Sequence, residues 1–181
     1  IARSGLCSRR DAERLIAEGR VAVDGTTLAS PACLVTDASR IVVDGKPLPA
    51  AEATRLWRYH KPRGLVTTAS DEKGRETVYA VLERAGEALP WVAPVGRLDK
   101  ASEGLLLLTN DSEWGARVAA PETHLEKTYH VQIGSVAGEE LAAAMLNGVR
   151  TQEGDVLRAG RACLLRAGEK NCWLEITLSE G

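Results

Sequence analysis

Residues 91–111 read WVAPVGRLDKASEGLLLLTND, and this stretch is the most informative about the fold. Two apolar runs, residues 91–95 and 105–109, flank a polar loop that begins and ends with glycine. Runs of this length predict two β-strands. A rigid loop between strands can hold a reactive side chain in place. The loop is not of the P-loop type, because its second glycine precedes leucine and not Lys-Ser or Lys-Thr.

Further strands and helices are expected on both sides of this stretch. Mixed strands and helices with several strands in succession indicate an α+β class, with a mainly antiparallel sheet and flanking helices. The expected strands are residues 56–60, 128–133, 162–166 and 172–178. The expected helices are residues 77–85, 112–119 and 138–147, the last ended by Gly148.

The first 49 residues are expected to form a compact unit of their own. Ser8 and Asp11 have the spacing of a capping box, and an apolar helical face follows them. Gly19 is expected to end this helix. Two short strands, residues 21–25 and 41–45, each finish in Asp-Gly, a pair typical of tight hairpin turns.

Five arginines crowd the first 20 residues: Arg3, Arg9, Arg10, Arg14 and Arg20. Arg10 and Arg14 are four residues apart and share one helix face. One interpretation is a solvated face with an Arg9–Glu13 ion pair. The other is a patch that faces RNA phosphates.

Composition sets broad limits on the class of protein. The chain has 181 residues, 44% of them hydrophobic and 27% charged, which suits one ordinary domain or two small ones. No apolar run approaches the roughly 20 residues of a membrane helix, so no membrane is expected as a partner. Four cysteines without metal-ligand spacing predict free thiols and favour the cytoplasm. The net charge of −2 argues against nucleic-acid binding unless the charge is unevenly distributed.

The N-terminal motif Gly-Leu-Cys-Ser-Arg-Arg-Asp-Ala-Glu-Arg-Leu-Ile, residues 5–16, with Gly-Arg-Val-Ala-Val-Asp-Gly at residues 19–25, resembles a known RNA-binding domain. It is similar to the alpha-L domain first known from a small-subunit ribosomal protein. The resemblance implies an RNA-binding domain over residues 1–48 and favours the phosphate-facing arginines. A linker is expected at residues 49–55. The family's domain starts earlier, so we expect the chain to lack its beginning.

The loop motif, residues 96–111, resembles the signature of the RsuA-type pseudouridine synthases, which act on ribosomal RNA. His-Lys-Pro-Arg-Gly at residues 60–64 and Lys-Thr-Tyr-His-Val at residues 127–131 support this in the family's order. The resemblance implies a catalytic domain over residues 56–181, with Asp99 as the catalytic aspartate and Tyr129 in the active site. An arginine-rich motif usually follows Leu-Ser-Glu-Gly in the family, so the domain is expected to be incomplete at its C-terminus.

Uridine isomerisation explains why one carboxylate is enough. The base changes its attachment to the sugar without redox change or an added group, so neither cofactor nor metal is expected. Asp99 either attacks covalently or removes a proton, and both routes stay open. Arg97 either opposes a burial-induced rise in the pKa of Asp99 or helps to displace the target nucleotide.

Four further residues are expected to bind substrate. Tyr129 shares an apolar strand face with Val131 and Ile133, and is expected to be either a half-buried strand tyrosine or a ring that packs on the uracil. Lys127 has the same parity and is expected to touch phosphate or an acidic partner. Lys61 and Arg63 are expected either as a plain basic surface turn or as phosphate contacts.

The resulting hypothesis is an enzyme that isomerises a uridine in ribosomal RNA, or in a ribosomal assembly intermediate, and works as a monomer. Another structured RNA as substrate remains open. A silent RNA-binding or ribosome-assembly module is the alternative from another class, because it needs the arginines but not Asp99. A glycosidase with Glu103 as its second carboxylate fits less well.

Overall fold

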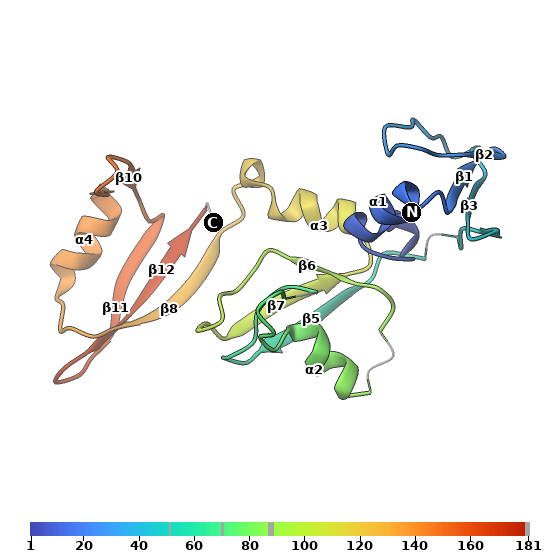
Figure 1. The fold of residues 1–181 in the computed structure, drawn as a ribbon. Coiled ribbons are helices and arrows are strands. Elements are labelled where there is room, and N and C mark those ends of the chain that lie inside the picture. Colours follow the sequence, from blue (N-terminus) through green and yellow to red (C-terminus); the bar gives the residue numbers. More distant parts are fainter. Residues whose placement is uncertain (51, 70, 87–88, 180–181) are drawn as a thin grey trace. The chain divides into compact units, whose positions relative to one another are not determined.

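The computed structural model describes residues 1–50, 52–69, 71–86 and 89–179. The chain divides into two compact units, Ile1–Val118 and Ala119–Gly181, which are described separately. Helices and short antiparallel sheets are mixed along both units, so the α+β prediction is confirmed (Figure 1). Among the described residues, strands pair antiparallel throughout, apart from one isolated parallel bridge between Val66 and Thr77.

The first unit begins with a 3₁₀ turn, Ala2–Ser4, and helix α1, Arg9–Ala17. Ser8 caps α1, because its hydroxyl oxygen accepts a hydrogen bond from the backbone N–H of Asp11 at 3.1 Å. The same hydroxyl donates to the Asp11 carboxylate at 2.6 Å. The predicted cap is therefore confirmed, but the carboxylate accepts from the Ser8 side chain and not from its backbone N–H as in a capping box.

A four-stranded sheet follows, in the order β2-β1-β3-β4. The two inner strands are β1, Val21–Val23, and β3, Ile41–Val43, and the outer ones are β2, Thr26–Thr27, and β4, Lys46–Pro47. Each Asp-Gly pair lies beyond its strand and forms the turn itself. Both residues of each pair have positive φ, 50° and 84° at residues 24–25 and 50° and 77° at residues 44–45, as a type I′ hairpin turn requires. The core below the sheet contains Ile16, Val21 and Val43.

A three-stranded sheet of order β5-β7-β6 forms the rest of this unit. Its strands are β5, Leu56–Lys61, β6, Ala93–Val95, and β7, Gly104–Thr109, so all three predicted strands are confirmed with ends shifted by one or two residues. Helix α2, Val78–Arg84, packs on one face (Figure 1). The core there comprises Leu65, Val78, Val92, Leu106 and Leu108.

Helix α3, Ser112–Ala119, approaches the other end of this sheet closely. A Cβ atom at Gly115 would lie 3.1 Å from the Thr109 methyl group and 3.5 Å from a Val95 methyl group, so glycine permits this close packing. Asp111 caps the helix, because its Oδ1 atom accepts from the backbone N–H of Trp114 at 2.9 Å. The predicted helix over residues 112–119 is confirmed.

The second half of the expected linker is bound to the end of β7. The Asn110 side chain donates to the carbonyl of Ala53 at 3.1 Å and accepts from the backbone N–H of Arg55 at 2.8 Å. Thr54 donates to the Asp111 carboxylate at 2.8 Å. Because Asn110 is buried, these bonds satisfy an amide that would otherwise be costly to bury. Residues 53–55 therefore belong with the three-stranded sheet.

The second unit contains a three-stranded sheet of order β11-β12-β8. Its strands are β8, Lys127–Ile133, β11, Arg161–Ala167, and β12, Cys172–Leu178, and helix α4, Glu139–Asn147, packs against β11. These elements were all predicted. A 3₁₀ turn, Pro121–Thr123, and a small hairpin of β9, Val149–Arg150, and β10, Val156–Leu157, were not.

All four cysteines are free thiols, and Cys172 is buried. Within the described ranges, no helix has the length and apolar character needed to cross a membrane.

We predict that Asn110→Ala lowers the free energy of unfolding by about 1–3 kcal/mol, because it removes both bonds that hold residues 53 and 55 and leaves buried polar groups unpaired. Urea unfolding followed by circular dichroism measures this change. Asn147→Ala, at the exposed end of α4, is the matched control and should change stability by less than about 0.5 kcal/mol. Equal effects of the two variants would contradict this account of the segment.

Candidate active site

Lys61, the last residue of β5, forms hydrogen bonds to the backbone of the polar loop that follows β6. The Lys61 side chain is fully buried, and its Nζ atom donates to the carbonyls of Asp99 at 2.9 Å, Ser102 at 2.8 Å and Pro62 at 3.2 Å. An ammonium has three N–H donors, so these three carbonyls use all of them. Burial lowers the pKa of the Lys61 ammonium, and the negative charge of Asp99 opposes that shift.

Two more residues, Thr67 and Gly64, form three hydrogen bonds that fix the loop backbone at Leu98 and Lys100. The Thr67 hydroxyl donates to the Leu98 carbonyl at 2.8 Å and accepts from the Leu98 N–H at 3.3 Å. The backbone N–H of Gly64 donates to the Lys100 carbonyl at 2.7 Å. Gly64 has φ +94°, a conformation that side chains rarely adopt, so glycine suits this position. The segment at residues 61–67 thus determines the backbone path on both sides of Asp99.

Asp99 lines a pocket with a volume of about 300 Å³. The pocket is lined by residues 66–68, Arg75 and residues 97–100. Its charged side chains are those of Arg75, Arg97, Asp99 and Lys100, which is three cations to one anion. The site is therefore locally positive although the chain carries a net charge of −2. A positive hollow around one exposed carboxylate suits a polyanionic ligand.

The carboxylate of Asp71, which does not line this pocket, orients the Arg75 side chain. Its guanidinium donates to Asp71 through Nη2 at 2.6 Å and through Nε at 3.1 Å. The Asp71 side chain is only 6% exposed, and the hydrogen bonds from Arg75 lower the pKa of Asp71 to about 2. This fork holds Arg75 in one orientation at the pocket wall.

The other predicted residues of the loop region are found in different environments. Arg97 and Asp99 line the same pocket, and no ion pair joins them in the described part of the chain. Arg63 is exposed and pairs with Glu103, Nε to Oε2, at 3.5 Å. Lys61 is buried, so the expected surface position of Lys61 is wrong. The physical reason is that its strand neighbours Trp57 and Tyr59 face the core, and residue 61 has the same parity.

Tyr129 and Lys127 belong to the second compact unit, on β8. Burial alternates along this strand, and Lys127, Tyr129, Val131 and Ile133 lie on its less exposed face. Tyr129 pairs across the sheet with Ile176 of β12. The predicted half-buried apolar face is confirmed. The substrate-binding roles of Tyr129 and Lys127 stay predictions.

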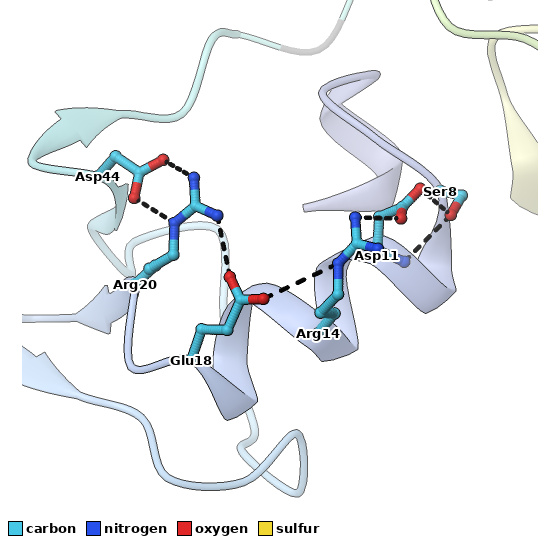
Figure 2. Close-up of polar contacts among 6 residues, drawn as sticks. All are labelled: Ser8, Asp11, Arg14, Glu18, Arg20 and Asp44. Atoms are coloured by element: carbon cyan, nitrogen blue, oxygen red, sulfur yellow. Dashed lines mark hydrogen bonds and ion pairs between the residues drawn. The ribbon is translucent and has the colours of Figure 1, made fainter.

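The five N-terminal arginines are exposed, and four of them are ion-paired. Arg3 pairs with Glu113 at 3.4 Å and Arg9 with Glu13 at 3.8 Å. Figure 2 shows a longer row of contacts that joins Ser8, Asp11, Arg14, Glu18, Arg20 and Asp44. Arg10 makes no ion pair with any residue the structure describes. The predicted Arg9–Glu13 pair is confirmed, and Arg10 is the arginine best placed for an external anion.

Comparison with known families agrees with this geometry. A model described as RNA pseudouridylate synthase matches residues 55–181, and the S4 domain model matches residues 1–46. The chain belongs to the RNA pseudouridylate synthase family. The resemblance inferred from its motifs is thereby confirmed, as is the prediction of an RNA-modifying isomerase.

Individual relatives and a solved structure agree with the family. An uncharacterised RNA pseudouridine synthase of Rickettsia conorii is 39% identical over all of this chain and 76% of its own length. A protein of Bacillus subtilis named ribosomal large subunit pseudouridine synthase B is 35% identical over all of this chain and 73% of its own length. A pseudouridylate synthase crystal structure, 28% identical, matches with a TM-score of 0.58 over all of this chain and 75% of that chain.

Four residues of this candidate site were missed or misassigned from sequence. Thr67, Asp71 and Arg75 belonged to none of the motifs that identified the site. Alternation along β5 was the available signal for Lys61, because Trp57, Tyr59 and Lys61 are spaced by two. The partners of Thr67 are backbone atoms of Leu98, which no side-chain pattern reveals.

We predict that Lys61→Met reduces kcat by at least about tenfold, because it leaves the Asp99 and Ser102 carbonyls unpaired and loosens the backbone around Asp99. Affinity for RNA should change far less, since Lys61 is buried. Turnover and fluorescence anisotropy on the same preparations separate the two effects. Lys73→Met, at an exposed lysine, is the matched control.

A Lys61→Met protein with normal kcat would contradict the positioning role. If it fails to fold, Thr67→Val provides the second test, because it removes only the two bonds to Leu98.

Proposed function

We propose that this synthase converts uridine in ribosomal RNA to pseudouridine with Asp99 as its catalytic residue. The observation that carries the proposal is the exposed Asp99 carboxylate, which lines a positive pocket while its own backbone carbonyl is bound by buried Lys61. A carboxylate whose backbone is fixed needs little reorganisation when a nucleotide enters, which favours catalysis.

The isomerisation has a simple balance of bonds. The bond between the anomeric carbon and N1 of uracil breaks, and a bond from the same carbon to C5 forms. The hydrogen on C5 is lost to solvent, and N1 gains a proton. One carboxylate accounts for either initiating route, by attack on the sugar or base or by proton removal.

The other residues have supporting roles in this proposal. Arg97, in the same pocket, contacts the target nucleotide and helps to displace it from its stack. Tyr129 packs against the flipped uracil, as its half-buried position on β8 allows. Arg63 and Lys127 contact RNA phosphates. Lys61 acts through the loop and not on phosphate, because its three donors are already used.

Glu103 is paired with Arg63 and does not line the pocket of Asp99. Hydrolysis of a glycosidic bond normally uses two cooperating carboxylates, one as acid and one as base or nucleophile. Isomerisation with a single carboxylate therefore fits this pocket better.

Two observations support RNA, and ribosomal RNA in particular, as the substrate. The N-terminal S4 domain carries the exposed arginines, of which Arg10 lacks an intramolecular partner among the described residues. The name of the Bacillus subtilis relative refers to the large ribosomal subunit. We propose the large-subunit rRNA, free or in an assembly intermediate, as the first substrate to test. A monomeric protein in the cytoplasm is the proposed form.

Tritium release from RNA labelled at C5 of uridine tests the function directly. The rRNAs of the small and the large ribosomal subunit are both tested. We predict that the wild-type chain releases tritium from one of them, and that Asp99→Asn reduces release by at least about a thousandfold. Asparagine keeps the shape of the side chain but can neither act as a base nor form the covalent bond. RNA binding, measured by anisotropy, should stay within about twofold.

Glu103→Gln is the matched control, because it removes a carboxylate of the same loop that lies outside the pocket. Loss of turnover in Glu103→Gln with normal turnover in Asp99→Asn would reverse the assignment of the catalytic residue. Tight binding without release from rRNA or from assembly intermediates would favour a non-catalytic RNA-binding protein.

A further inference from the structure

The row of contacts in Figure 2 contains more carboxylates than guanidinium groups. Asp11, Glu18 and Asp44 alternate with Arg14 and Arg20, so three negative charges face two positive ones. With all three carboxylates in place, both guanidinium groups of the row are paired with a carboxylate. A phosphate that contacts both arginines would replace one of these carboxylates.

The outer two carboxylates fix the arginines. Asp44 accepts a two-pronged contact from Arg20, to Nε at 2.7 Å and Nη2 at 2.6 Å, and these hydrogen bonds lower the pKa of Asp44. Asp11 accepts from Nη2 of Arg14 at 2.9 Å and is itself bound by the Ser8 hydroxyl. Asp11 thereby orients the guanidinium group of Arg14, and Asp44 orients that of Arg20. Each guanidinium keeps further N–H donors for another partner.

One further nitrogen of each arginine lies near Glu18. Nη1 of Arg20 lies 2.9 Å from Oε2 of Glu18, and Nε of Arg14 lies 4.0 Å from Oε1. Glu18 accepts only one short hydrogen bond in this row, whereas Asp11 and Asp44 each take part in two, although the three side chains are about equally exposed. Exposed ion pairs of this kind contribute little to stability and exchange easily with solvent.

Helix stability does not explain an acidic residue at this position. Glu18 is the C-cap of α1, where the helix dipole disfavours negative charge. A hollow of about 390 Å³ is lined by Arg20, Asp44, Gly19 and Gly45 among others, but not by Glu18 or Arg14.

We propose that Arg14 and Arg20 form a binding site for an RNA phosphate, which the Glu18 carboxylate occupies until RNA displaces it. The inference rests on the proposed function, because it requires that the chain acts on RNA. Rotation of the Glu18 side chain exposes two guanidinium groups that Asp11 and Asp44 keep in place. Glu18 thereby lowers the affinity of the free protein for RNA, and the site contributes only where a phosphate reaches both arginines.

The test compares two charge-neutralising variants of the full chain. The affinity of Glu18→Gln and of Glu13→Gln for a fluorescein-labelled RNA hairpin is measured by anisotropy at one fixed salt concentration. Both variants remove one exposed negative charge from the α1 region, but Glu13 contacts only Arg9 among the described residues, at 3.8 Å. We expect Glu18→Gln to bind about threefold more tightly than wild type, and Glu13→Gln to gain less than half of that.

The gain from Glu18→Gln should disappear when Arg14→Gln is present, because the site then lacks one guanidinium. Equal gains in Glu18→Gln and Glu13→Gln would overturn the proposal, since they would reflect general electrostatics. A lower melting temperature of Glu18→Gln without tighter binding would also overturn it and make Glu18 a link that stabilises the domain.

Tritium release by the same preparations separates this inference from the proposed function. Tighter binding of Glu18→Gln without release by the wild type would sustain the phosphate site and refute the isomerase on that RNA. Release by the wild type without the gain would sustain the isomerase and refute the phosphate site.

Discussion

The bonds of the buried Lys61 ammonium to the loop carbonyls are the interaction on which the proposed catalytic site depends. A buried charge is tolerated only when its hydrogen-bonding capacity is used, and here three carbonyls use it. Two of these carbonyls belong to Asp99 and Ser102. The Lys61 ammonium therefore keeps its hydrogen bonds only while the loop keeps its present backbone conformation. The stability of the fold and the proposed catalysis by Asp99 therefore require the same conformation of the loop backbone.

Charge is divided unevenly along this chain, and the division explains how an acidic protein can act on RNA. Three cations and one anion line the pocket of Asp99, whereas the row from Asp11 to Asp44 has a surplus of one negative charge. The net charge of −2 describes neither place. Local charge, and the carboxylates that hold each arginine, determine where a phosphate is able to bind.

The fold class and most elements could be predicted because they depend on local patterns. Each of these patterns lies within a few neighbouring residues: the apolar runs next to glycines, the Ser8 cap and the two Asp-Gly turns. The Arg9–Glu13 pair was predictable for the same reason. Strands β9 and β10 were missed because two residues are too short for a recognisable alternation.

The contacts of the site were harder to predict, because their partners are distant in the chain. The carbonyls that Lys61 binds are 38 and 41 residues away, and the Asp44 partner of Arg20 is 24 residues away. Every residue type has a backbone carbonyl, so the sequence does not show which carbonyls a lysine binds. A buried lysine with carbonyl partners therefore cannot be told from a surface lysine by its sequence context. The loop motif identified Asp99 by resemblance, but its support by Thr67 and Gly64 required the structure.

The most direct test of the central claim is a crystal structure of the Asp99→Asn protein with an RNA fragment that contains the uridine identified by its turnover. We expect a flipped uridine in the 300 Å³ pocket, with the side chain of residue 99 in contact with the nucleotide and Lys61 still bound to the loop carbonyls. A uridine bound elsewhere, or a loop that has left Lys61, would contradict the account.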